Sequence, residues 1–167
     1  MIADRTMATL DGRRAPLLAA GKVNVFVFVR TGHDHSESAL RQLAQLEREV
    51  AGKPVRLAVV VSGGEIPREV ARLVRETGLH APVLVDSDDA LYGELGVAMY
   101  PSAGIVGRDR KLTGFQPFRK VNYLDAMRGR VQFALGEIDE AALAKILDPG
   151  IEPIPGGGRA HARLNLA

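Results

Sequence analysis

The sequence contains no cysteine and no tryptophan, and the missing cysteine excludes the most. Without a thiol the chain forms no disulfide, holds no metal through a cysteine thiolate, and carries out neither thiol–disulfide exchange nor thiol peroxidase chemistry. It also lacks an apolar run near the roughly 20 residues of a membrane span. Its N-terminus has no apolar h-region, so as given the chain is predicted to be cytoplasmic, and extracytoplasmic if a leader or anchor was trimmed.

An excess of one charge is absent as well. Lys and Arg number 22 against 20 Asp and Glu, which gives a net charge of +2. The two signs are interleaved, which predicts no basic face of the kind that binds nucleic acid. Neither nucleic acid nor a membrane is therefore an expected partner. The chain is 46% hydrophobic and 25% charged, the balance of a globular domain whose core needs no disulfide or metal.

Hydrophobic periodicity predicts strands that alternate with helices. A hairpin is expected within 7–18, where Asp11-Gly12 is a typical turn pair. Longer strands are expected at 22–29, 55–62, 81–86 and, as two strands joined by a turn, within 101–115. Helices are expected at 34–51, 67–78, 88–97, 122–135 and 139–147. This order predicts an α/β fold, with a mixed central sheet and helices on both faces.

The composition changes after Leu147. Residues 1–147 are predicted to form one domain, and 148–158 are rich in proline and glycine, as linkers are. Residues 159–167 are expected to be a short helical tail or the stub of a following module, too short to be stable alone. Within the domain, Gln116-Pro117 is predicted to interrupt the last strand.

The turn between the first buried strand and the first helix carries most of the reactive side chains. It reads Gly32-His33-Asp34-His35-Ser36. Asp34 lies three residues before Glu37 and ahead of an apolar-periodic segment, which predicts a capping box with Asp34 as the cap. On this interpretation the turn serves the structure of the helix and needs no ligand.

Two chemical interpretations of the same turn remain open. His33 and His35 form a His-x-His pair, but a metal site needs three or four ligands, so no metal or cofactor is expected. A metal-dependent activity at this pair is kept as an alternative. Ser36 beside two histidines has the residue types of a hydrolase, but it lacks the Gly-x-Ser-x-Gly elbow, so that activity is not expected.

Longer stretches of the chain resemble a known family. "ATLDGRRAPLLAAGKVNVFVFV" (8–29) resembles the opening hairpin and first central strand of the redoxin branch of the thioredoxin superfamily, which holds thiol–disulfide reductases and peroxiredoxin-like proteins. "PVLVDSDDALYGELGVAMYPSAGIVGRDRKL" (82–112) resembles the stretch leading to that family's cis-proline and final hairpin. The resemblance spans about residues 6 to 146 and implies a thioredoxin-like three-layer sandwich with an N-terminal hairpin extension.

The resemblance also places the turn at the family's redox motif, Phe-Trp-Ala-x-Trp-Cys-x-x-Cys. His33 and Ser36 then stand at the two cysteine positions, and Gly32 stands at the preceding tryptophan. Pro101, after Tyr100, falls where the family has the cis-proline that faces the motif. The family grips extended substrate chains there, which implies a protein or extended-peptide partner here.

The sequence therefore predicts a degenerate redox site rather than a working one. The leading hypothesis is a non-catalytic binding or adaptor domain without a cofactor. Its predicted binding surface consists of Gly32, His33, Asp34, His35, Ser36, Tyr100 and Pro101. The alternative is an oxidoreductase or antioxidant-family protein that acts with a partner carrying the redox group.

Overall fold

The middle of the sheet is built from the most apolar strand of the sequence. The structure is a computed structural model and describes residues 1–149. All six residues of β3 (Val23–Phe28) are buried, as expected for a strand covered on both faces. Its one polar side chain is satisfied locally, because the Asn24 amide accepts from the Ala19 N–H at 2.9 Å and donates to the Lys22 carbonyl at 3.1 Å.

The elements follow the predicted order, with boundaries that shift by a few residues. The strands are β1 (Thr6–Thr9), β2 (Arg14–Pro16), β3 (Val23–Phe28), β4 (Val55–Ser62), β5 (Val83–Asp86), β6 (Ser102–Val106) and β7 (Leu112–Pro117). The helices are α1 (Ser36–Glu49), α2 (Pro67–Thr77), α3 (Ala90–Leu95), α4 (Tyr123–Leu135) and α5 (Glu140–Leu147). Pro67 opens α2 and Gly78 ends it in the left-handed conformation, as such residues commonly do.

The strands form one mixed sheet in the order β2-β1-β5-β4-β3-β6-β7. β3, β4 and β5 run parallel to one another, while β6 is antiparallel to β3 and β7 to β6. The N-terminal hairpin of β1 and β2 joins the other edge, where β1 pairs antiparallel with β5. The predicted mixed sheet with an N-terminal hairpin is confirmed.

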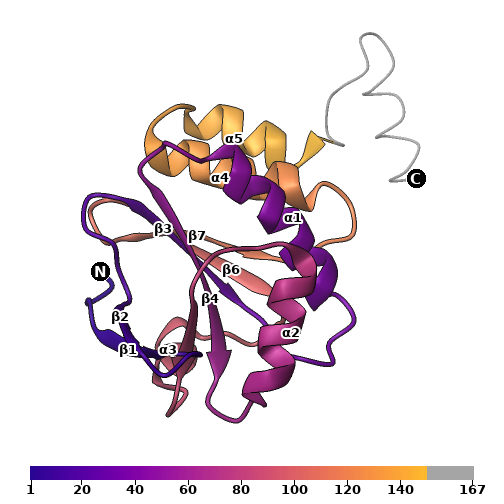
Figure 1. The fold of residues 1–167 in the computed structure, drawn as a ribbon. Helices are drawn as coiled ribbons and strands as arrows, with labels where there is room; N and C mark the ends of the chain where they lie inside the picture. The colour runs from indigo at the N-terminus through magenta and orange to yellow at the C-terminus, as the bar shows by residue number, and fades with distance from the viewer. Residues whose placement is uncertain (150–167) are drawn as a thin grey trace, which may run out of the picture.

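Helices cover both faces of this sheet (Figure 1). On one face, Val25 and Val27 of β3 share a buried cluster with side chains of α1, α2 and α4. On the other face, Phe26 and Phe28 pack with α3 and with Leu17 and Leu18, which precede β3. α5 packs on α4 as an outer layer. The predicted α/β sandwich is therefore also confirmed in its layers.

The predicted capping box is wrong. α1 begins at Ser36 with His35 as its N-cap residue, and no side chain caps it. The Ser36 N–H instead donates to the His33 carbonyl at 3.1 Å, which closes a turn with Asp34 at its exposed centre. Glu37 does not reach back to the cap, because its carboxylate accepts from Arg41 at 2.8 Å, one helical turn ahead.

The predicted interruption of the last strand is also wrong. β7 continues through Gln116 and Pro117, and Gln116 lies opposite Ala103 of β6 with 6% of its surface exposed. Pro117 is tolerated because β7 is the edge strand and ends there, so no ladder hydrogen bond is lost on its outer side.

The chain beyond 149 lies outside the described residues. That range holds most of the predicted linker at 148–158 and all of the predicted tail at 159–167. α5 ends at Leu147, and the domain boundary placed there stays a prediction. Within residues 1–149, no helix has both the length and the apolar character needed to cross a membrane.

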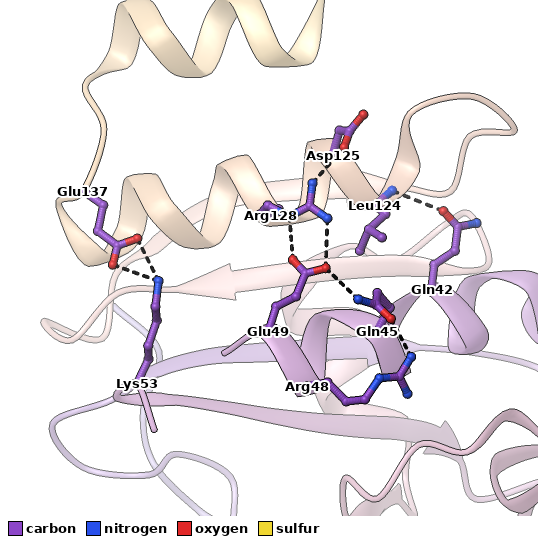
Figure 2. A network of polar contacts seen from close by, with 9 residues as sticks. All are labelled: Gln42, Gln45, Arg48, Glu49, Lys53, Leu124, Asp125, Arg128 and Glu137. Atoms are coloured by element: carbon purple, nitrogen blue, oxygen red, sulfur yellow. Dashed lines mark hydrogen bonds and ion pairs between the residues drawn. The ribbon is translucent and has the colours of Figure 1, made fainter. Parts of the chain in front are cut away.

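A polar network fastens the C-terminal end of α1 to α4 (Figure 2). Arg128 donates from Nε and Nη2 to the two carboxylate oxygens of Glu49, at 2.6 and 2.9 Å, and from Nη1 to Asp125 at 2.8 Å. Gln45 donates to the same Glu49 carboxylate at 3.2 Å. The Arg128 hydrogen bonds, against a smaller burial effect, hold the pKa of Glu49 below its ordinary value of 4.5.

This network generates a prediction about acid stability. Arg128→Ala should lower the free energy of unfolding at pH 7 by about 1 kcal/mol or less, because the side chains of Arg128 and Glu49 remain 35% and 28% exposed. The folded-state pKa of Glu49 lies below its ordinary value of 4.5. The contribution of Glu49 to the free energy of unfolding is therefore fully present above pH 4.5, and it is lost as the pH falls through the lower, folded-state pKa. Urea denaturation of both proteins across pH 3–7 measures the difference.

The matched control is Arg41→Ala, which removes an exposed pair with Glu37 within one helix. Its effect should be smaller, about 0.3–0.5 kcal/mol. A difference between wild type and Arg128→Ala that does not change with pH would mean that the arginine acts through its packing, and the ionic interpretation would be wrong.

Candidate functional site

Four loops meet at one edge of the sheet, and the register of the strands puts them there. This edge is formed by the ends of the central strands and not by an outer strand. β3, β4 and β5 all end at this edge because they are parallel, with Ser62 opposite Asp86. β6 begins at the same edge, because it is antiparallel to β3 and its Ser102 lies opposite Phe28. Tyr100 and Pro101 therefore come next to the turn that follows β3.

The turn itself consists of two consecutive tight turns. The His33 N–H donates to the Arg30 carbonyl at 3.4 Å, and the Ser36 N–H donates to the His33 carbonyl at 3.1 Å. Gly32 has a φ of +76°, the left-handed region in which a side chain is strained. The glycine at the place of the family's tryptophan is thus required by this backbone. Gly32, His33 and Asp34 are exposed.

Ser36 lies beneath this exposed surface. It is 1% exposed, and its hydroxyl donates to the Arg30 carbonyl at 2.8 Å. The hydroxyl proton is therefore committed to the backbone instead of to a histidine, which is the opposite of an activated nucleophile. At the position that the resemblance assigns to the family's second cysteine, this chain has a buried residue that braces the turn.

The two histidines differ in their surroundings. His33 is exposed, whereas the half-buried His35 stacks on Phe118 with ring centroids 4.9 Å apart. Phe118 in turn lies 5.0 Å from Tyr123, and its N–H donates to the Pro101 carbonyl at 2.9 Å. This aromatic chain ties the turn to the residue predicted to face it.

The geometry of the predicted metal pair is limited to two ligands. The His33 and His35 rings lie 5.8 Å apart, and residues 1–149 contain no group of three or more His, Asp or Glu arranged to hold a metal ion. His80 lies beside Glu47, near the far end of α1 from the turn. His161 lies outside the described residues.

Tyr100 lies at the same edge, next to the turn. The Tyr100–Pro101 peptide bond is cis, as expected from the resemblance, and Pro101 itself is buried. The guanidinium of Arg30 sits over the Tyr100 ring at 5.2 Å. Partial burial raises the pKa of Tyr100 and the Arg30 charge opposes that shift, so the ring stays a neutral, aromatic surface near pH 7.

A cleft of about 770 Å³ opens beside Tyr100, between the turn and α3. Three of its lining side chains, Glu65, Asp89 and Tyr92, were not among the residues singled out from the sequence. The Glu65 carboxylate accepts from the Thr31 N–H at 3.3 Å and from the Thr31 hydroxyl at 2.5 Å. Asp89 accepts from Ser62 at 2.7 Å.

The floor of the cleft is aromatic and neutral. The buried Tyr92 lies 5.7 Å from Tyr100 and donates its hydroxyl to the Val60 carbonyl at 3.1 Å. Burial raises the pKa of Tyr92 far above its ordinary value, so the hydroxyl stays protonated. The signal that could have found the cleft is the run of polar residues directly after β4 and β5, since the ends of parallel strands meet at one edge.

Comparison with known proteins identifies this architecture. The sequence matches no protein-family model and no curated protein. Solved structures do match the fold. A secreted Mycobacterium tuberculosis disulfide oxidoreductase, homologous to E. coli DsbE, is 19% identical with a TM-score of 0.65, over 77% of this chain and 95% of its own.

Two further structures agree with it. The pneumococcal exposed lipoprotein thioredoxin Etrx1, from Streptococcus pneumoniae strain TIGR4, is 24% identical with a TM-score of 0.61, over 81% of this chain and all of its own. A thiol:disulfide interchange protein of the thioredoxin family from Chlorobium tepidum TLS is 17% identical with a TM-score of 0.67, over 80% and 94%. The chain has a thioredoxin-like fold.

This thioredoxin-like chain lacks the residue on which the chemistry in those names depends. Disulfide exchange needs a thiolate, and this chain has no cysteine. Of the predicted surface residues, the structure exposes Gly32, His33 and Asp34, half-buries His35 and Tyr100, and buries Ser36 and Pro101. That these residues bind a partner stays a prediction, as does the cytoplasmic location.

The vacated motif can be tested by restoring sulfur. His33→Cys combined with Ser36→Cys should give a folded protein that closes an internal disulfide reversibly, because the bond from Ser36 N–H to the His33 carbonyl already holds the two positions across one turn. Thiol titration and mass spectrometry after oxidation measure closure. The thiol introduced by His33→Cys should have a lowered pKa, since the start of α1 stabilises a thiolate.

The control pair is His35→Cys with Ser38→Cys, also three residues apart. It should close less readily, because His35 already has nearly helical backbone angles and Ser38 lies within α1, so the two Cβ atoms are about 5–6 Å apart, farther than the roughly 3.5–4.5 Å of a disulfide. If the 33/36 pair stays reduced under oxidants that close ordinary dithiols, the alignment of this turn with the redox motif fails.

Proposed function

We propose that this chain is a non-redox, thioredoxin-like binding domain that holds an extended segment of a partner protein along the edge formed by residues 30–36 and 99–101. The observation that carries the proposal is apolar exposure. Ile66, Met99 and Val121 are 53%, 61% and 69% exposed, and they lie on three of the loops at this edge. Apolar side chains exposed on the loops beside a groove offer contacts to an apolar segment of a partner.

The edge also offers two adjoining hollows for alternate side chains of an extended segment. Beside the cleft at Tyr100 lies an apolar groove of about 160 Å³, lined by Met99, Phe115 and Pro117 among others. The segment 96–98 lines both hollows. An extended peptide sends successive side chains to opposite sides, so it could place one in the cleft and another in the groove.

Binding without electron transfer fits the state of the turn. Ser36 is buried and hydrogen-bonded to the backbone, and Nδ1 of His33 accepts from the backbone N–H of His35 at 3.4 Å. The neighbouring structures are named as disulfide oxidoreductases, and a redox role here would need the cysteines to come from the partner. That alternative makes a separate prediction about which segment is captured.

The proposal predicts which surface residue controls binding. Met99→Asp should weaken binding of a selected peptide at least about tenfold, because it puts a charge into the lining of the apolar groove. Peptides are selected from a displayed random library on the wild-type chain, and their affinity for each variant is measured by interferometry. Tyr100→Ala should weaken binding similarly, since it removes the wall of the cleft.

Leu112→Asp is the matched control. Leu112 is also an exposed large apolar residue, at 40%, but it starts β7 at the opposite end of the sheet. Its substitution should leave affinity unchanged. Equal losses in Met99→Asp and Leu112→Asp would contradict the proposed edge. Selection of peptides that all contain a cysteine pair would instead favour the alternative of a redox-carrying partner.

A further inference from the structure

A pair of arginines lies between the end of β7 and the two last helices. Arg119 follows β7, Arg130 belongs to α4, and both side chains are half-buried. Neither forms an ion pair with a carboxylate of residues 1–149. Arg130 binds Gln116, which lies three residues before Arg119, so the two arginines belong to one neighbourhood at the end of β7. Burial lowers the pKa of Arg130, and the positive charge of Arg119 lowers it further.

Arg119 presents an unused pair of donors. Its Nη1 donates to the carbonyl of Leu147, the last residue of α5, at 2.9 Å. Its Nε and Nη2 are buried and have no hydrogen-bond partner among the described residues. In a guanidinium, Nε and Nη2 point their N–H bonds the same way, and this is the fork that grips two oxygens of a carboxylate or phosphate.

Arg130 is held in place by two neighbours on β7. Its Nε donates to the side-chain carbonyl of Gln116 at 2.8 Å. Its Nη1 lies over Gly114, where a Cβ atom would come within 2.5 Å of that nitrogen. The glycine therefore makes the space into which the guanidinium packs. The remaining donors of Arg130 are not used by any described carboxylate.

Arg56, another half-buried arginine, shows how a guanidinium group is balanced by an acid elsewhere in this fold. Arg56 donates to the Leu17 carbonyl at 2.6 Å, and the carboxylate of Asp4 lies near enough to favour its charged form. The charge that acts on Arg130 is instead that of Arg119, a second cation. Two half-buried cations without an anion cost free energy that a bound anion would return.

We propose that Arg119 and Arg130 form a binding site for a dianionic oxyanion, of the class of a phosphate group. The Nε–Nη2 fork of Arg119 takes two of its oxygens, and Arg130 takes a third. A dianion matches the two positive charges, whereas a single carboxylate would leave one of them unbalanced. This site is separate from the peptide-binding edge and does not depend on that proposal.

Thermal unfolding of the full chain tests the site, with inorganic phosphate as the probe at pH 7.5 and sodium chloride at matched ionic strength as the reference. Phosphate at about ten times its Kd should raise the Tm by about 3–5 °C. Arg130→Gln and Arg119→Lys should each abolish the rise. The lysine keeps the charge but lacks the fork. Arg56→Gln, the matched control, should keep the rise.

Two outcomes overturn the proposal. A wild-type Tm that does not respond to phosphate, together with a higher Tm in Arg130→Gln, would show two arginines that merely repel. A rise with acetate equal to that with phosphate would contradict the dianion. Glu152 is the one acidic side chain in 150–167. If Glu152→Gln removes as much stability as Arg119→Lys in phosphate-free buffer, the chain's own carboxylate fills the site and the proposal fails.

Discussion

Burial of β3 on both faces is the constraint from which the geometry of the edge follows. The strand lies between parallel β4 and antiparallel β6, and Phe26 and Phe28 point to one face while Val25 and Val27 point to the other. A slip of one residue would exchange the two sets, so the register is strongly fixed. That register places Ser102 opposite Phe28, and hence Pro101 beside the turn. Core packing sets this arrangement, so it does not require the cysteines.

The turn shows how a site changes when the reactive atoms are gone. Ser36 is buried where the family has its second cysteine, and its hydroxyl braces the Arg30 carbonyl at 2.8 Å. A thiol would be a weak donor at this place, whereas a hydroxyl is a strong one. Around it, Glu65 is held by Thr31. Several polar groups of the edge are thus engaged in holding loops together, and shape and apolar exposure gain weight in recognition.

Local sequence patterns predicted the elements well where burial decides them. β4 is apolar from Leu57 to Val61 and lies between Pro54 and Gly63, and its predicted and observed ranges are both 55–62. The start of α1 was misjudged, because Asp34 and Glu37 have the spacing of a capping box but a positive φ at Gly32 arranges the turn differently. Propensity at a helix end is a weak preference, and two hydrogen-bonded turns outweigh it.

The cleft escaped prediction because its contacts span the chain. Thr31 and Glu65 are 34 positions apart, and Arg30 reaches Tyr100 from a different strand altogether. No periodicity within a window of residues carries such pairs, and only the meeting of strand ends at one edge suggests them. The family resemblance supplied the position of Pro101, but it could not supply Glu65 or Asp89, which belong to this chain's own loops.

The loop at 118–122 connects the two sites proposed for this molecule. Phe118 faces the edge, where it stacks on His35 and donates to the Pro101 carbonyl, while Arg119 faces α5 and donates to Leu147. Val121, in the same loop, supplies part of the exposed apolar surface. An oxyanion bound by Arg119 would hold the backbone between these residues from one side. One loop therefore carries residues of both proposed sites.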